Sequence, residues 1–252
     1  MSVSSPVKID RERVEELIAG ELRSLNERTR ASAAMYERAR RSLSGGVASS
    51  YQLRDPWPIY LTAGEGASVT DVDGNRYWDF HNGFGSMVQG HAHPAIVAAL
   101  RERAPLGTHF AAVTEDTVVV AEELSRRFGL ERWRFVNSGS EATMDAIRIA
   151  RALTRRETIV KIFGSYHGHH DAVMVSIGVP YEDIGDRDDL ASLPYGAGIP
   201  AAISDLTVAV PFNDAGARSS AIRRSMRRSI APASLNGTAT VMSLTAFGMP
   251  AP

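Results

Sequence analysis

The first part of the chain holds two stretches in which apolar residues recur at helical spacing. Asp10 is placed to cap a helix that the pattern predicts to run to about Asn26. Its apolar stripe, typical of a helix docked on a larger body, consists of Val14, Leu17, Ile18, Leu22 and Leu25. A second helix is predicted over residues 31–43, ending at the Gly45-Gly46 pair.

A stretch rich in predicted strands follows. Residues 59–61 predict one strand, and residues 67–72 and 76–80 predict the two strands of a hairpin. The hairpin is favoured because Asp73-Gly74-Asn75 supplies residues that accept positive φ. After a glycine-rich segment, His93-Pro94 predicts a helix that runs through Arg103, since proline is tolerated in a first turn.

From Thr114 the pattern alternates between helices and short apolar strands. Helices are predicted over 115–128 and 140–153, and strands over 132–136, 158–163, 172–177 and 206–210. This alternation predicts an α/β fold with an open, mostly parallel sheet. The strands 132–136 and 158–163 are expected to be neighbours in that sheet, joined by the intervening helix through a right-handed crossover.

The last 38 residues, 215–252, differ from the rest because they contain no Asp, Glu, Lys, Tyr or Trp. Ile222, Met226 and Ile230 fall at helical spacing among arginines, which is the pattern of a basic amphipathic helix for membranes or nucleic acid. One short stripe is a frequent accident of composition, so a poorly ordered tail is favoured.

Composition narrows the classes of protein. The 28 basic and 29 acidic side chains nearly cancel, which favours neither nucleic acid nor an acidic membrane as a partner. The absence of cysteine excludes disulfides, thiolate zinc sites and a cysteine nucleophile. No apolar run approaches the roughly 18 residues needed to span a bilayer, so a cytoplasmic protein is expected. Only two of the basic residues are lysines, Lys8 and Lys161.

The most informative motif is Asn137-Ser138-Gly139-Ser140-Glu141-Ala142, where a predicted strand runs into a predicted helix. Unpaired N–H groups at a helix N-terminus attract anions, and Gly139 lets the backbone approach a phosphate closely. The simpler interpretation is a capped helix with Ser140 as its N-cap. The motif by itself leaves both interpretations open.

A second motif, Gly164-Ser165-Tyr166-His167-Gly168-His169-His170-Asp171, follows the predicted strand 158–163. Ligands of open α/β sheets bind outside the carboxyl ends of strands, so this motif and the Ser-Gly-Ser turn should converge. An aromatic ring and an imidazole beside an anion site suit a flat, phosphorylated heteroaromatic ligand. The alternative is a metal site that uses His167, His169, His170 and Asp171, joined by His91 and His93.

Five stretches, in this order, resemble class III aminotransferases of the type I pyridoxal-phosphate fold, and most nearly the glutamate-1-semialdehyde aminomutase group. They are Gly45-Gly46-Val47, residues 71–80, Gly90-His91-Ala92-His93-Pro94, residues 137–142 and residues 164–171. The resemblance covers roughly residues 32–214. It implies an N-terminal segment of helices and small-domain strands over 1–110 and the first part of the coenzyme-binding α/β domain over 111–214, followed by the atypical tail over 215–252.

The resemblance also implies a coenzyme, a site and partners. Ser138, Gly139 and Ser140 would hold the phosphate of pyridoxal 5′-phosphate, Tyr166 would stack on its ring, and His167 would lie at the ring edge. The neighbourhoods of Gly46 and Phe84 would face substrate. Partners would be a small-molecule amino donor and acceptor, in a protein that is typically a homodimer, with no nucleic acid and no membrane.

Two family features have no counterpart in this sequence. The family binds its coenzyme through a lysine far C-terminal to the matched motifs, and pairs the pyridinium nitrogen with an aspartate on a later strand, whereas this chain has no Lys and no Asp after residue 214. Lys161 lies on a predicted strand with no evident reason to be desolvated. We therefore expect an aminotransferase- or aminomutase-like chain with no catalytic residue of its own, resembling the N-terminal part of such an enzyme. The alternatives are a non-catalytic pyridoxal-phosphate-fold module and a His/Asp metallohydrolase.

Overall fold

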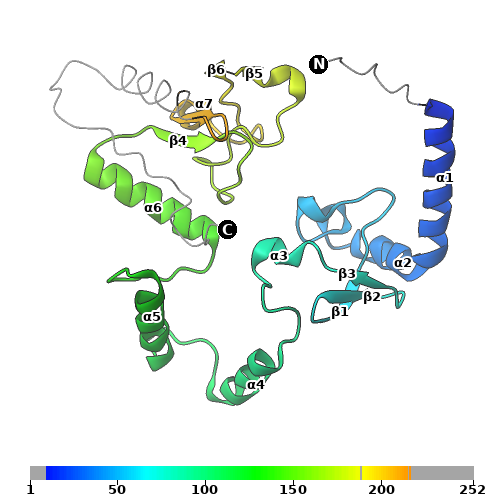
Figure 1. Cartoon of the computed structure of the whole chain (residues 1–252), viewed down its shortest axis with the longest axis horizontal. Coiled ribbons are helices and arrows are strands. Elements are labelled where there is room, and N and C mark those ends of the chain that lie inside the picture. Colours follow the sequence, from blue (N-terminus) through cyan, green and yellow to red (C-terminus); the bar gives the residue numbers. More distant parts are fainter. Residues whose placement is uncertain (1–9, 188, 215, 217–252) are drawn as a thin grey trace, which may run out of the picture. The chain divides into compact units, whose positions relative to one another are not determined.

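A computed structural model describes residues 10–187, 189–214 and 216, so Lys8 and all of the tail except Gly216 lie outside it. The chain divides after Thr114 into two compact units, which are described one at a time (Figure 1). The family resemblance predicts this boundary at residue 110, four residues earlier. No helix among the described residues combines the length and the apolar character that crossing a membrane requires.

The first unit opens with two consecutive helices. Helix α1 (Arg11–Arg28) begins at Asp10, whose side chain accepts a hydrogen bond from Arg13 N at 3.1 Å, as predicted. Helix α2 (Arg30–Ala39) ends four residues before the predicted end, and 3₁₀ turns follow at Ser44–Gly46 (η1) and Ser50–Gln52 (η2).

The apolar stripe of α1 is largely exposed, so docking of this helix on a larger body stays a prediction. None of its residues is buried, and four of its apolar side chains are 42 to 53% exposed: Val14, Leu17, Ile18 and Leu22. Helical periodicity reports a face that is able to pack, whereas burial needs a partner surface.

A three-stranded antiparallel sheet in the order β1-β2-β3 follows. It consists of β1 (Leu61–Glu65), β2 (Ser68–Asp71) and β3 (Arg76–Trp78), so the predicted hairpin is confirmed. The predicted strand 59–61 is wrong, because β1 starts only at Leu61. Tyr60 instead bonds to the region around α2: its N donates to Ser32 Oγ at 3.3 Å, and its hydroxyl donates to Gly46 O at 2.6 Å.

The hairpin turn caps the helices beside it. The Asp73 carboxylate accepts hydrogen bonds from Ala31 N at 2.6 Å and Ser32 N at 2.9 Å, the second and third N–H groups of α2. Asn75 Nδ2 donates to Arg28 O, at the end of α1, at 2.8 Å. Since helix ends leave such groups without intrahelical partners, the turn both closes the hairpin and fixes the α1–α2 junction.

The turn is itself held by Asp71, which is 1% exposed. Its carboxylate accepts hydrogen bonds from Asp73 N, Asn75 N, Asn75 Nδ2 and Tyr77 Oη at 2.7 to 3.0 Å. Burial acts to raise the pKa of Asp71, but these hydrogen bonds outweigh it and leave the pKa below its ordinary value. Burial and the bond to Asp71 raise the pKa of Tyr77 to about 12.

Helix α4 (Pro94–Arg103) matches the predicted bounds and is followed by η3 (Ala104–Leu106). His93 is its N-cap and accepts a hydrogen bond from Ala95 N at 3.3 Å. Before it lies the short α3 (Asn82–Gly85), a tight turn in which all four residues have positive φ.

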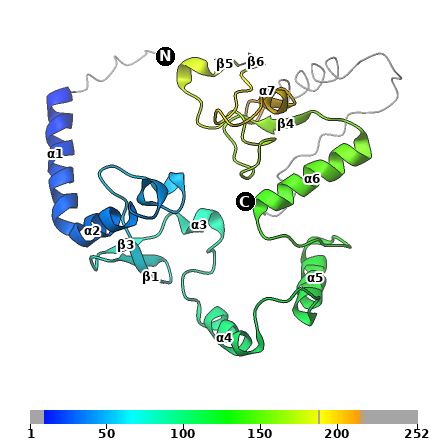
Figure 2. The same cartoon turned by 180° about the vertical axis from the view of Figure 1, so that it is seen from behind.

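The second unit holds the predicted α/β elements. Helices α5 (Glu115–Phe128) and α6 (Gly139–Thr154) agree with prediction, and β4 (Ile159–Ile162) pairs in parallel with β7 (Thr207–Val210). The segment between these two strands holds η4 (Tyr181–Asp183), β5 (Gly185–Asp186), β6 (Asp189–Leu190) and α7 (Ala201–Ser204). Figure 2 shows α6 leading into β4.

Two predicted strands of this unit are wrong. Residues 132–136 form no strand, and the neighbour of β4 is β7 rather than this segment. Trp133 packs on α5 instead, with its Nε1 donating to Ser125 Oγ at 3.0 Å and its ring 5.9 Å from that of Phe128. A strand needs a ladder partner, and no strand among the described residues pairs with this run.

Residues 172–177 also form no regular strand, apart from one isolated bridge between Val175 and Pro194. They nevertheless supply much of the core of the second unit, since Val173, Val175 and Ser176 are 0% exposed. The apolar run therefore predicted burial correctly and secondary structure incorrectly, because the backbone groups bond to several different segments instead of one ladder.

Candidate functional site

The N-terminus of α6 is the first part of the candidate site. Ser138 is the N-cap, since its Oγ accepts a hydrogen bond from Glu141 N at 3.2 Å, while Glu141 Oε2 accepts one from Asn137 N at 2.7 Å. The assignment of Ser140 as N-cap is therefore wrong. The helix geometry leaves the first N–H groups, those of Gly139 and Ser140, without intrahelical partners, and a Cβ built on Gly139 meets no atom within 4 Å.

Ser140 joins the helix to the second motif. Its Oγ accepts a hydrogen bond from His169 N at 2.8 Å, and one turn later Thr143 Oγ1 donates to His167 O at 2.7 Å. Gly168 lies so close that a Cβ there would be 2.7 Å from Ser140 Cα. The predicted convergence of the two motifs is thus observed. Thr143 was missed, although its place three residues after Ser140 sets it on the same helix face.

Tyr166 and His167 differ in their surroundings. Tyr166 is 61% exposed, so its ring is available to a ligand. The Ser165 hydroxyl donates to Ile162 O, so the 3.1 Å contact between Ser165 Oγ and His167 Nε2 places the imidazole proton on Nε2. Burial, assisted by the positive charge of Lys161, lowers the pKa of His167, so the imidazole is neutral at pH 7.

Lys161 overturns one expectation from the sequence. It is the buried residue of β4, 3% exposed, and its Nζ donates to Val175 O at 2.5 Å. Burial lowers the pKa of Lys161 to about 8. The expectation that this lysine is not desolvated is wrong, because the predicted strand supplied no information about which segment covers it.

The two residues expected to face substrate lie in the first unit. Gly46 has a positive φ of 73° and is buried beneath Tyr36, whose Cε2 would lie 2.5 Å from a Cβ at this position. Phe84 is 68% exposed, with its ring centroid 4.0 Å from that of His81 and 5.3 Å from that of Tyr51. Facing substrate remains a prediction for both.

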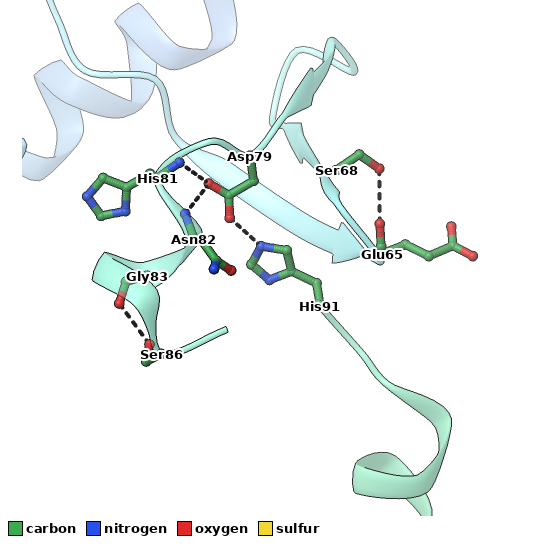
Figure 3. A network of polar contacts seen from close by, with 8 residues as sticks. All are labelled: Glu65, Ser68, Asp79, His81, Asn82, Gly83, Ser86 and His91. Atoms are coloured by element: carbon green, nitrogen blue, oxygen red, sulfur yellow. Dashed lines mark hydrogen bonds and ion pairs between the residues drawn. The ribbon is translucent and has the colours of Figure 1, made fainter. Parts of the chain in front are cut away.

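A carboxylate network supports the segment that carries Phe84 (Figure 3). Asp79 Oδ1 accepts hydrogen bonds from His81 N and Asn82 N, each at 2.9 Å, and Oδ2 accepts one from His91 Nε2 at 2.7 Å. These bonds, led by the one from His91, lower the pKa of Asp79. The network ties the positive-φ turn α3 to the residue that opens the His-Ala-His-Pro motif.

The alternative of a metal site requires several ligating side chains to be grouped in space. Within residues 10–187, 189–214 and 216, no three side chains of His, Cys, Asp or Glu gather closely enough to hold a metal ion. His170 Nε2 lies 3.2 Å from Thr143 Oγ1, and burial is the main cause of its lowered pKa.

Comparisons with known proteins identify the family and the fold. The class III aminotransferase family matches residues 50–229, where the sequence motifs span roughly 32–214. The chain belongs to the class III aminotransferases, and its fold is that of the type I pyridoxal-phosphate-dependent transferases.

The relatives are aminomutases and transaminases. The chain is 41% identical over 181 residues to glutamate-1-semialdehyde 2,1-aminomutase of Methanopyrus kandleri, a match that covers 71% of this chain and 40% of the relative. It matches the structure of a glutamate-1-semialdehyde aminomutase from Pseudomonas aeruginosa with a TM-score of 0.73 and 31% identity, covering 86% of this chain and 47% of that one.

An ω-transaminase from Sphaerobacter thermophilus matches with a TM-score of 0.70 and 39% identity, over 77% of this chain and 44% of that one. A further solved relative, similar at the same TM-score of 0.70, is described as a transaminase with PLP bound. The chain thus spans about two fifths of the length of the curated relatives that it matches.

Proposed function

We propose that this chain binds pyridoxal 5′-phosphate at the N-terminus of α6 and contributes that site to an enzyme that transfers amino groups. The observation that carries the proposal is the pair of hydrogen bonds, Ser140 Oγ from His169 N and Thr143 Oγ1 to His167 O, that holds the loop 164–171 against α6. When bound, the coenzyme supplies the electron sink on which amino-group transfer depends.

The described residues fit the coenzyme's shape and charge. The N–H groups of Gly139 and Ser140, with the positive end of the helix dipole, suit a phosphate, and the space in front of Gly139 is open. The exposed ring of Tyr166 suits stacking on a pyridine ring. The neutral His167 suits the edge of that ring without adding a charge.

The residues do not supply covalent attachment. Lys161 is 3% exposed and hydrogen-bonded to Val175 O, and the remaining lysine, Lys8, belongs to the N-terminal segment outside the motifs. We therefore expect this chain by itself to bind the coenzyme reversibly and to show no turnover. In that respect it behaves as the non-catalytic module that the sequence left open.

Ligand-binding measurements on the purified 252-residue chain test the proposal. Gly139→Leu places a side chain where the phosphate would lie, and the open space at Gly139 lets the fold accept it. Gly196→Leu is the matched control, since Gly196 also has open space and no positive φ. Fluorescence titration with pyridoxal 5′-phosphate should show binding to the wild type and to Gly196→Leu, and none to Gly139→Leu. Equal binding by both variants would contradict the site.

The finer features of the whole protein belong to the same proposal. The substrates would be a small-molecule amino donor and acceptor, as in the names of the relatives, and whether the reaction is a transamination or an intramolecular aminomutation depends on residues that touch substrate. We further propose a homodimer located in the cytoplasm, without nucleic-acid or membrane partners. Size-exclusion chromatography with light scattering tests the dimer, and cell fractionation tests the location.

A further inference from the structure

A buried amine next to the candidate site has no place in the function proposed above. Lys161 is 3% exposed, and removing an ammonium from water is costly unless its hydrogen bonds are replaced. Its position in β4 sets it opposite Ala209 of β7, which is itself buried. An apolar side chain would pack here without this desolvation cost. The presence of a buried, hydrogen-bonded lysine therefore needs an explanation.

The hydrogen bond from Lys161 reaches the segment that contains Val175. This segment forms no strand ladder with β4. Within residues 172–176, the carbonyl groups find four different donors: Thr207 Oγ1 for Ala172, Tyr195 N for Met174, Lys161 Nζ for Val175 and Gly164 N for Ser176. Two of these donors, Lys161 and Gly164, come from β4 and the residues just after it. These two donors therefore replace hydrogen bonds that a neighbouring strand would otherwise supply.

The same two bonds close the loop that carries the candidate site. The loop 164–171 leaves at the end of β4 and returns as the buried segment, and the bonds from Lys161 to Val175 O (2.5 Å) and from Gly164 N to Ser176 O (2.8 Å) join its two sides. Inside the loop, His167 and His169 bond to α6. Loss of the Lys161 bond would leave a buried carbonyl unpaired at the base of the loop.

We propose that Lys161 is a positioning residue, whose amine holds the base of the loop 164–171 closed and so keeps Tyr166 and His167 in place for the coenzyme. The identity of the ligand in this inference rests on the proposed function. The role of Lys161 in closing the loop does not depend on that function. Burial of Lys161 excludes direct contact with a ligand in this arrangement.

The absence of cysteine from the chain allows a test that changes one amine only. Lys161→Cys is alkylated in urea and refolded, once with bromoethylamine, which restores a lysine-like amine, and once with bromoethane, which leaves a neutral ethyl group of similar shape. Both forms are compared with wild-type protein taken through the same treatment. Two readouts follow: hydrogen exchange of residues 165–170 in the ligand-free chain, and affinity for pyridoxal 5′-phosphate.

The ethyl form should exchange about tenfold faster in the loop and bind the coenzyme about tenfold more weakly, whereas the aminoethyl form should match wild type in both. Ser176→Ala is a control within the same buried segment, because it removes the side-chain bonds to residues 191–193 and should loosen those residues alone. Alkylated forms that behave alike, whether both fold or both fail to fold, would overturn the proposal. If wild-type chain binds no coenzyme, the proposed function fails while the exchange measurement still decides the role of Lys161.

Discussion

Replacing Lys161 by methionine should change how the stability of the second unit depends on pH. A lysine in the unfolded chain has a pKa of about 10.4, and burial lowers the pKa of Lys161 to about 8. Between these two values the unfolded state binds a proton that the folded state does not. The free energy of unfolding contributed by this residue therefore rises as pH increases from about 8 to 10.4.

The size of the effect follows from the pKa difference. One pKa unit corresponds to about 1.4 kcal/mol, so the rise amounts to about 3 kcal/mol when the window is crossed completely. At pH 7, Lys161→Met relieves the burial of a charge but leaves Val175 O without its donor, two changes of opposite sign. The change with pH is therefore a sharper prediction than the stability at any single pH.

Urea unfolding of the wild type and of Lys161→Met at several pH values between 7 and 10.5 measures this difference. The tyrosines that also titrate there are common to both proteins, so comparing the two isolates the lysine. The stability of the wild type relative to the variant should increase by about 3 kcal/mol over this range. A difference that stays constant with pH would refute the reasoning.

Direct observation of the amine provides a second check, because the chain has only two lysines. In protein labelled at the lysine ε-carbon, NMR should show a signal that titrates near pH 8 and is missing from Lys161→Met. The pKa of His167 should rise in Lys161→Met, since the charge of Lys161 is one cause of its lowering, while burial keeps it below the ordinary value. If the signal that is missing from Lys161→Met has its midpoint near the ordinary value of about 10.4 in the wild type, Lys161 is not buried as described.

Two further predictions concern local geometry. Asp73→Ala removes the carboxylate that accepts hydrogen bonds from N–H groups in the first turn of α2, so urea unfolding should show a loss of about 1 to 2 kcal/mol in the free energy of unfolding. The control Glu21→Ala, at an exposed position, should show no measurable loss. Equal losses for the two variants would contradict the capping role of Asp73. Gly168→Ala places a Cβ 2.7 Å from Ser140 Cα and should weaken coenzyme binding and loosen the loop, whereas Gly129→Ala, also at positive φ but facing open space outside the loop, should cost stability alone. Identical coenzyme affinities for these two variants would show that the close approach to Ser140 does not matter.

Elements whose signals are local could be predicted from the sequence. Asp10 and His93-Pro94 mark true helix starts, the Asp-Gly-Asn turn marks the hairpin, and α5 has the predicted bounds. Each depends on residues within a few positions of one another, whose backbone preferences and side-chain caps act without a distant partner. The five ordered motifs likewise led to the family, since they require no knowledge of contacts.

Tertiary structure decided everything that depends on a partner remote in the chain. Residues 132–136 and 172–177 have the composition of strands, yet a strand forms only where another strand accepts its ladder. Three of these interactions join residues that are far apart in the chain. The bond that buries Lys161 spans 14 positions, the cap from Asp73 spans 42, and the bond between Ser140 and His169 spans 29. Hydrogen bonds and burial are properties of groups brought together in space, and a linear pattern carries no record of which groups those will be.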